Sequence, residues 1–547
     1  MPGIFRLLCV GLAAAIGAGA SCLPVRAEEP FRLGVQTHFA QGWSLGLIDR
    51  MAALGVSTFR DELTWARSEG ADGTLSFAGA ENAAIDRALR RGIAPLVLFA
   101  DRHPAHDGGG TPASDEAQAA FARYVAAAVR AHAPGLAEIE IGNEFNGGDF
   151  VRGAFARDPA GNLARLVGAV RRRLRDEGLR VRLVCSGTHS VAIGFLDRFL
   201  AAGGARDCDA ISLHPYRDHP EGLELELARL GRVMEAHGGR LPIVATEFGK
   251  WFDDPDEAPD YMLRMVAILG AAGVDAAYWY ALVDEPWWPN MGLLDADLAE
   301  KPAADAFRLA QRLLAFGRPR AAGTSARQRI YYFGASRRAA IAWGAGGRLS
   351  VSGATAFLDT RGRPVARPAT LSDRPVVILG KDLRISVTGA SPLADSRYDF
   401  GRAPWHYFSE GPDGRLRPLS WIDWQWSSFL GRPDLRPLAA YFDGVTAALF
   451  ADGAHRVVER FVVPAGGRLR ILGEWSSDDA GPEGDGAEVL VRLDGKVLAR
   501  GRVAGQPFGL DRTVEVRAGQ TLDFVVGPGR APGGDAVRRR IRIQRAD

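Results

Sequence analysis

Two stretches decide the fold, Glu138-Ile-Glu-Ile-Gly-Asn143-Glu144-Phe-Asn146 and Pro242-Ile-Val-Ala-Thr-Glu247-Phe-Gly249. Each contains a short apolar run typical of a buried strand, and each run ends in a glutamate. The carboxyl ends of parallel barrel strands all lie on one face, where barrel proteins carry their functional side chains. The two stretches therefore predict two strands of one barrel whose tips bring two carboxylates to the same mouth.

The same strand pattern recurs along the first half of the chain, with amphipathic helical segments between the strands. Eight such units over roughly 290 residues fit a (β/α)8 barrel. A doubly wound open sheet is the alternative, but no glycine-rich nucleotide loop follows the first strand. The strands are expected at Phe31–Thr37, Val56–Asp61, Ala94–Phe99, Ala137–Gly142, Val181–Ser186, Ala210–His214, Ile243–Thr246 and Ala276–Ala281.

Beyond Phe316 the helical periodicity stops, and short alternating strands separated by Gly, Pro and Asp take over. We predict an α/β chain with a signal peptide at 1–27 and a (β/α)8 TIM barrel at 28–320. A small β module packed on the barrel (321–395) and a jelly-roll-like sandwich (396–547) follow. Trp421, Trp424 and Trp426 alternate in the last segment, as a sugar platform or as an interdomain core, with the core favoured.

The first 27 residues have the pattern of a secretory signal, with an apolar stretch at Leu7–Ala20 and a cleavage site after Ala27. They predict a periplasmic or secreted protein without a transmembrane segment once the signal is removed. A lipoprotein anchored at Cys22 is the less favoured alternative. Removal leaves Cys185 and Cys208, which the strand assignment separates by about 15–20 Å along the barrel axis. We therefore predict two buried thiols and no disulfide.

The chain carries 67 basic and 65 acidic residues, for a net charge of +2. Such a balance offers no electrostatic footprint for nucleic acid or an anionic membrane. No cluster of Cys and His has the spacing of metal ligands. We expect a monomer that acts without metal or cofactor.

Two glutamates facing each other across a barrel mouth are the groups that hydrolysis of a glycosidic bond requires. In a retaining enzyme the carboxyl groups lie about 5 Å apart, so that one attacks the anomeric carbon while the other protonates the leaving oxygen. The acid needs a raised pKa and the nucleophile must stay ionised. Glu144 and Glu247 are the candidates, with Asp284 and Glu285 held in reserve.

The segment Ile141-Gly-Asn143-Glu144-Phe145-Asn146 resembles the Asn-Glu-Pro-Asn signature of glycoside hydrolase family 39 and its neighbours in clan A. The resemblance covers the barrel and extends to Arg60, His214-Pro-Tyr216, Trp279 and the stretch from Gly292 to Pro302. It implies Glu144 as acid/base, Glu247 as nucleophile and Asn143 as the group that binds the sugar's 2-hydroxyl. Phe145 in place of the usual proline leaves the subfamily open.

Eight residues are predicted to bind or position the substrate: Arg60, Asn143, Asn146, His38, His214, Tyr216, Trp251 and Trp279. Arg60 would keep Glu247 ionised, or would pair with a neighbouring acid. His214 would orient a carboxylate or a sugar hydroxyl, or fill the core. Tyr216 would hydrogen-bond the nucleophile. The tryptophans suit the CH faces of sugar rings, with core packing as the alternative for each.

Together these features predict a secreted retaining β-glycosidase that acts by double displacement. A polysaccharide, cleaved internally, is favoured over a short oligosaccharide as substrate. The loops at 145–157 and 284–297 would build an extended cleft for it. A bacterial exopolysaccharide is favoured as substrate by analogy alone. Two alternatives stay open: a non-catalytic carbohydrate-binding component of a polysaccharide export or biofilm system, and a transglycosylase of the same fold.

Overall fold

The computed structural model describes residues 30–100, 102–323, 325–389, 392–477, 486–530 and 533–546. The predicted signal segment at 1–27, including Cys22, lies outside the described residues. Among the helices of the described part, none combines the length and the apolar character that crossing a membrane requires.

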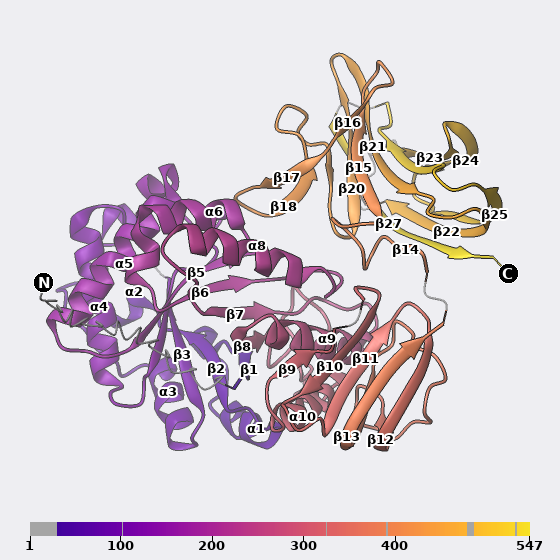
Figure 1. The fold of residues 1–547 in the computed structure, drawn as a ribbon. Coiled ribbons are helices and arrows are strands. Elements are labelled where there is room, and N and C mark those ends of the chain that lie inside the picture. The colour runs from indigo at the N-terminus through magenta and orange to yellow at the C-terminus, as the bar shows by residue number, and fades with distance from the viewer. Residues whose placement is uncertain are drawn as a thin grey trace, which may run out of the picture.

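Eight parallel strands close into a barrel in sequence order (Figure 1), which confirms the predicted fold class. Alternate residues of these strands point inward, and Leu96, Val184 and Tyr278 belong to the cluster that fills the barrel. The strands are β1 (Arg32–Gln36), β2 (Thr58–Glu62), β3 (Ala94–Phe99), β4 (Glu138–Ile141), β5 (Arg182–His189), β6 (Ala210–His214), β7 (Ile243–Phe248) and β8 (Val274–Trp279).

Helices surround the barrel and bury their apolar faces against the outward side chains of the strands. Two of them show the capping that starts a helix, because the side chains of Ser114 and Asp158 accept backbone N–H groups of the first turn. The helices are α1 (Leu47–Leu54), α2 (Trp65–Ser68), α3 (Ala80–Arg90), α4 (Asp115–Ala131), α5 (Pro159–Asp176), α6 (Ile193–Phe199), α7 (Ala205–Asp207), α8 (Leu223–Ala236), α9 (Ala258–Ala271) and α10 (Pro302–Leu314).

A five-stranded antiparallel sheet follows the barrel and lies against it. Trp343 donates its indole N–H to Glu221 of the barrel at 2.8 Å, and Arg329 pairs with Glu224 at 2.8 Å. These contacts hold the sheet to the first turn of α8 and to the loop before it. Its strands are β9 (Pro319–Ala321), β10 (Gln328–Phe333), β11 (Ala339–Gly344), β12 (Arg348–Leu358) and β13 (Val376–Thr388).

The remaining strands, β14 to β27, form an antiparallel unit with a hydrophobic core of its own, which includes Trp405, Trp475 and Phe524. We call it the C-terminal module. Its strands are β14 (Ala394–Asp395), β15 (Trp405–Glu410), β16 (Leu416–Pro418), β17 (Ser420–Asp423), β18 (Ser428–Gly431), β19 (Ala439–Ala440), β20 (Gly444–Phe450), β21 (Gly453–Val462), β22 (Gly467–Ser477), β23 (Ala487–Leu493), β24 (Lys496–Val503), β25 (Phe508–Val516), β26 (Thr521–Gly527) and β27 (Gly533–Arg545).

Cys185 and Cys208 form a disulfide, with their Cα atoms 6.0 Å apart, so the prediction of two buried thiols is wrong. The prediction assumed that β5 and β6 start level. In the observed register Cys185 instead pairs with Ile211, only three residues after Cys208. The chain before β6 also turns toward β5, because the Asp209 N–H donates to Leu183 O at 2.8 Å. Both effects shorten the separation to a bridgeable one.

Candidate active site

A cavity of about 660 Å³ opens at the carboxyl ends of the barrel strands, and both predicted glutamates line it. Its walls also include Asp443, which precedes β20 of the C-terminal module. The site is therefore built mainly by the barrel mouth and partly by the module that follows it.

Glu144 reaches the cavity through an unusual turn after β4. Gly142 and Glu144 both have positive φ, of 92° and 52°, and the Glu144 N–H donates to Gly187 O at 2.6 Å. A positive φ is uncommon for a residue with a side chain and often marks a functional position. The turn directs the Glu144 carboxylate toward the centre of the mouth.

Glu247 is held at both oxygens. Arg60 Nη1 donates to its Oε1 at 2.6 Å, and the Tyr216 hydroxyl donates to its Oε2 at 2.6 Å. Arg60 is 1% exposed, and it also donates to Glu140 at 2.6 Å and to Asn143 at 2.9 Å. A buried guanidinium and a hydroxyl together fix the orientation of the Glu247 carboxylate, as a nucleophile requires.

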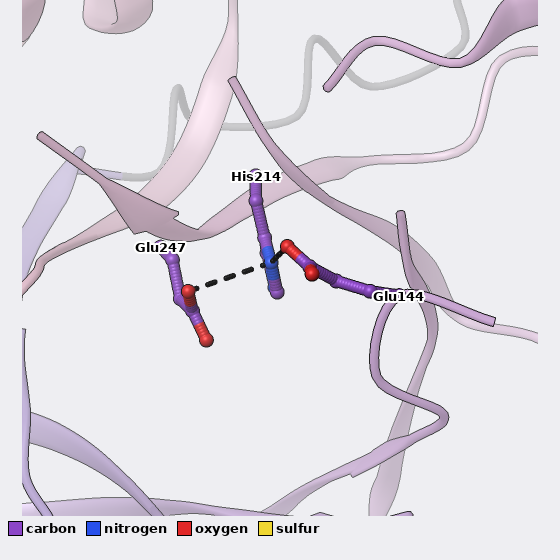
Figure 2. Close-up of side chains that lie close together, drawn as sticks. All are labelled: Glu144, His214 and Glu247. Atoms are coloured by element: carbon purple, nitrogen blue, oxygen red, sulfur yellow. Dashed lines mark hydrogen bonds and ion pairs between the residues drawn. The ribbon is translucent and has the colours of Figure 1, made fainter. Parts of the chain in front are cut away.

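The two candidate carboxylates lie close together beside His214 (Figure 2). One oxygen of Glu144, one of Glu247 and a ring nitrogen of His214 all lie within 4.8 Å of one another. His214 Nδ1 is 2.9 Å from Glu144 Oε1 and 3.5 Å from Glu247 Oε2. Inverting glycosidases hold their carboxyl groups roughly 6.5–9.5 Å apart, and retaining ones about 5 Å apart. The separation matches the retaining arrangement.

The electrostatics of Glu144 differ from the raised pKa that an acid/base is expected to have. Burial of the carboxyl favours its neutral form, but hydrogen bonds from His189 and His214 outweigh burial and lower the pKa of Glu144 to about 2. The pKa of His189 is raised, first because of its hydrogen bond to Glu144. The free site therefore favours an ionised Glu144 next to a protonated His189.

Another histidine, His38, also lines the cavity, next to Tyr280 after β8. Its Nε2 is 3.2 Å from the Tyr280 hydroxyl and 3.5 Å from Glu285. Burial lowers the pKa of His38 to about 4, so the ring is neutral at physiological pH. A neutral imidazole at this position can hydrogen-bond a sugar hydroxyl.

The three groups Glu144, His214 and Glu247 are types that can also bind a metal ion. The donor set fits hydrogen bonding better, because Arg60 and Tyr216 already occupy both oxygens of Glu247. A guanidinium in contact with a ligand oxygen also repels a second cation. The two carboxylates thus form a pair whose oxygens accept hydrogen bonds from neighbouring side chains.

Five of the eight predicted binding residues line the cavity: Arg60, Asn143, His38, Tyr216 and Trp251. His214 does not line it. Its side chain is fully buried, and its Nδ1 lies within 3.5 Å of both carboxylates.

The other two predicted binding residues lie outside the cavity lining, which corrects the assignment. Trp279 is fully buried on the outer face of β8, where it stacks on Phe252 and donates to Met291 O at 2.8 Å. Side chains alternate along a strand, and since Tyr278 points into the barrel, Trp279 must point outward. Asn146 is also buried and bonds to backbone groups of His189 and Gln425.

Several residues of the site were missed at the sequence level: Gln36, Glu140, Phe150, His189, Tyr280 and Asp443. Glu140 had a signal, because acids at Glu138 and Glu140 alternate along an otherwise apolar strand and so share its inner face. Tyr280 follows from the parity of β8 once Tyr278 is placed inside. His189 and Asp443 have no local signal.

The mouth of the cavity exposes aromatic rings. Trp251 and Trp288 stack on each other with ring centroids 5.2 Å apart, and they are 51% and 44% exposed. Phe150, 44% exposed, also lines the cavity. Exposed stacked rings at a cavity mouth offer flat apolar faces to a ligand.

No protein-family model and no curated protein sequence matches the chain. Solved structures do. A family 39 glycoside hydrolase from the gut symbiont Bacteroides cellulosilyticus WH2 matches with a TM-score of 0.55 at 19% identity, covering 65% of this chain and 81% of that one. A family 39 β-xylosidase from Caulobacter crescentus matches with a TM-score of 0.45 at 15% identity, covering 65% and 97%.

The first of these two structures is the more similar one, and at 19% identity the similarity shows a shared fold alone. The chain has the fold of a family 39 glycoside hydrolase. The resemblance expected from the Asn143-Glu144 motif is thus confirmed as a likeness of fold over 65% of this chain.

Proposed function

We propose that this protein is a retaining β-glycosidase that hydrolyses O-glycosidic bonds by double displacement. The observation that carries the proposal is the pair of carboxylates, Glu144 and Glu247, with oxygens within 4.8 Å of each other at the mouth of a barrel. The fold shared with a family 39 glycoside hydrolase supports it.

In the first step Glu247 attacks the anomeric carbon and the bond to the leaving oxygen breaks, while Glu144 supplies a proton to that oxygen. Arg60 and Tyr216 hold the Glu247 carboxylate fixed in orientation. In the second step Glu144 takes a proton from water, which displaces Glu247 and releases the sugar. Asn143, which lines the same cavity, would bind a sugar hydroxyl.

We propose a polysaccharide as the substrate, cleaved internally and outside the cytoplasm. The exposed Trp251–Trp288 pair gives sugar rings beyond the cleaved bond a surface to stack on. The Cys185–Cys208 disulfide supports export, because such bonds persist in oxidising compartments. The signal-like sequence of residues 1–27 points the same way. A bacterial exopolysaccharide remains the favoured member of this class.

The test is release of reducing ends from a panel of polysaccharides that includes the producing organism's own exopolysaccharide. Glu144→Gln and Glu247→Gln are each expected to lose about a thousandfold in kcat, which corresponds to about 4 kcal/mol of activation free energy. Glu257→Gln, an exposed glutamate in the loop before α9, is the matched control. NMR of the first anomer released should show retention of configuration.

The same panel separates the alternatives. Sugar binding without hydrolysis on any substrate would replace the proposal with a carbohydrate-binding component. Products longer than the substrate would indicate a transglycosylase. Full activity in Glu247→Gln would remove that residue as nucleophile, and product sizes would decide between internal and terminal cleavage.

A further inference from the structure

The hairpin of β17 and β18 leaves the C-terminal module and reaches the barrel beside α6 (Figure 1). Its tip, residues 424–427, offers backbone carbonyl groups to the loop after β5 and to the first turn of α6. The Gly194 N–H donates to Trp424 O at 3.2 Å, and the Ser190 hydroxyl donates to Trp426 O. The tip is therefore bound through main-chain atoms.

The contact between hairpin and barrel is tight and charged. A Cβ atom added at Gly194 would lie 2.4 Å from Asp423 O, so only glycine fits there. Arg229 of α8 donates to both carboxylate oxygens of Asp423 at 2.8 Å. The same guanidinium lies 4.5 Å from the centre of the Trp421 ring. Packing and charge together fix the hairpin in one position.

Asn146 connects the hairpin tip to His189. Its side chain is 5% exposed, and its Oδ1 accepts the His189 N–H at 3.0 Å. Its Nδ2 donates to His189 O at 3.1 Å and to Gln425 O at 3.0 Å. One buried amide thus ties both backbone polar groups of His189 to the hairpin. The His189 ring in turn places Nδ1 3.2 Å from Glu144 Oε1.

We propose that the hairpin is part of the catalytic apparatus: it fixes His189 beside Glu144, and His189 stores the proton that Glu144 delivers to the leaving oxygen. This inference rests on the glycosidase function proposed above. As the glycosidic bond breaks, His189 Nδ1 gives its proton to the Glu144 carboxylate, which passes one to the leaving oxygen. In the second step the proton taken from water returns to His189, so the pair ends as it began.

The charges around His189 agree with this role. The carboxylates of Glu144 and Glu247 both stabilise the protonated form of His189. The centroid of the Tyr216 ring lies 6.5 Å from that of the His189 ring. His214 faces the same carboxylate, and on the hairpin side Asp423 is already neutralised by Arg229. Asp443 on the module wall adds a further negative group to the cavity. The surroundings thus favour a protonated His189 and an ionised Glu144 as the resting pair.

The first experiment needs no substrate. The titration of His189 is followed by NMR of protein labelled at the histidine ring carbons. In the wild type it should titrate above an ordinary histidine, whose midpoint lies near pH ~6.5. In Glu144→Gln the midpoint should fall by at least half a pH unit. Gly194→Ala, which wedges the hairpin away, should lower it similarly, as should the milder Ser190→Ala.

Gly509→Ala is the control for the wedge, because a Cβ atom there meets nothing within 4 Å in the distant strand β25. Thermal melts identify any variant that has lost its fold. A His189 midpoint that stays at the wild-type value in folded Gly194→Ala and Ser190→Ala would overturn the role of the hairpin.

The second experiment measures kcat/KM against pH on the substrate found above. His189→Gln keeps a hydrogen-bond donor but cannot store a proton. The proton must then stay on Glu144, and a carboxyl group loses it at lower pH than a histidine does. The basic limb should therefore move down by at least one pH unit, with at least a tenfold loss of kcat at pH 7 and little change in KM.

His237→Gln, which alters a surface pair with Asp197, is the control and should leave the profile in place. A basic limb unmoved in His189→Gln would overturn the proton-storing role. If the wild type hydrolysed nothing, the glycosidase function would fail, while the NMR titration would still decide whether the hairpin fixes His189.

Discussion

Replacing Arg60 by methionine separates the stability of this site from its chemistry. The side chain is 1% exposed and donates to Glu140, Glu247, Gln36 and Asn143. Removing one partner of a buried ion pair leaves an uncompensated charge and costs about 3–5 kcal/mol. We expect Arg60→Met to lower Tm by about 6–10 °C on the scale for domains of this size. We also expect at least a hundredfold loss of kcat, because Glu247 loses its cation.

The double variant Arg60→Met/Glu140→Gln removes the charge that the single variant leaves buried. The amide oxygen of the new glutamine side chain can still accept from Thr246, which donates to Glu140 at 2.8 Å in the wild type. The double variant should therefore recover at least about 1.5 kcal/mol of stability, a coupling energy typical of contacting residues. Its activity should stay as low as that of Arg60→Met. Denaturant unfolding and kcat measured on the same preparations check both claims. A double variant that regains activity together with stability would refute the direct role of Arg60 at Glu247.

Three further predictions concern the disulfide, the hydrogen bond from Tyr216 to Glu247 and the tryptophans at the mouth of the cavity. The loop closed by Cys185 and Cys208 spans 23 residues. Closing this loop lowers the conformational entropy of the unfolded chain, which stabilises the folded protein by about 3 kcal/mol. The reduced protein should therefore melt roughly 6–9 °C lower, with unchanged activity at 25 °C. Tyr216→Phe keeps the ring and removes a hydrogen bond to a carboxylate; kcat should fall ten- to a hundredfold, and an unchanged kcat would contradict the assignment. Trp251→Ala and Trp288→Ala should each raise KM for a polysaccharide several-fold while leaving a small aryl glycoside unaffected, as parallel assays of the two substrates would reveal.

The barrel and its two carboxylates could be predicted because their signals are local. Apolar runs of strand length repeat between amphipathic helices, and Glu144 and Glu247 stand directly at the ends of two of them. Because both faces of a barrel strand are buried, such a strand appears in the sequence as a short, almost entirely apolar run. For the same reason Arg60, within the short strand β2, and Tyr216, two residues after β6, were correctly expected near the mouth.

The errors come from register and from parity, which a single strand does not reveal. Cys185 and Cys208 were separated because the stagger between β5 and β6 was taken as zero, whereas Cys185 pairs with Ile211. Trp279 was assigned to the mouth because the strand end was known but its inward face was not. A shift of one residue moves every side chain of a strand to the other face.

His189 and Asn146 illustrate a third kind of failure, because their partners lie far from them in the sequence. Asn146 bonds to a carbonyl group 279 residues away, and the hairpin that supplies it belongs to a different module. No spacing near Asn146 indicates such a partner. The Asn-Glu-x-Asn pattern therefore predicted that Asn146 makes polar contacts with a sugar, whereas in the structure it makes them with backbone groups.

The difference between local signals and long-range contacts also explains why the fold of this chain matches solved structures, although no protein-family model matches its sequence. A barrel core requires apolar residues of suitable size at alternating positions, and many sequences satisfy that requirement. The reacting pair adds only a few side chains at strand tips. What enters the cavity is decided elsewhere, by the loops that carry Phe150, Trp251 and Trp288 and by Asp443 from the C-terminal module. Since that module both lines the cavity and holds the hairpin against Asn146, changes in its sequence can alter substrate choice and proton supply together, without any change in the barrel.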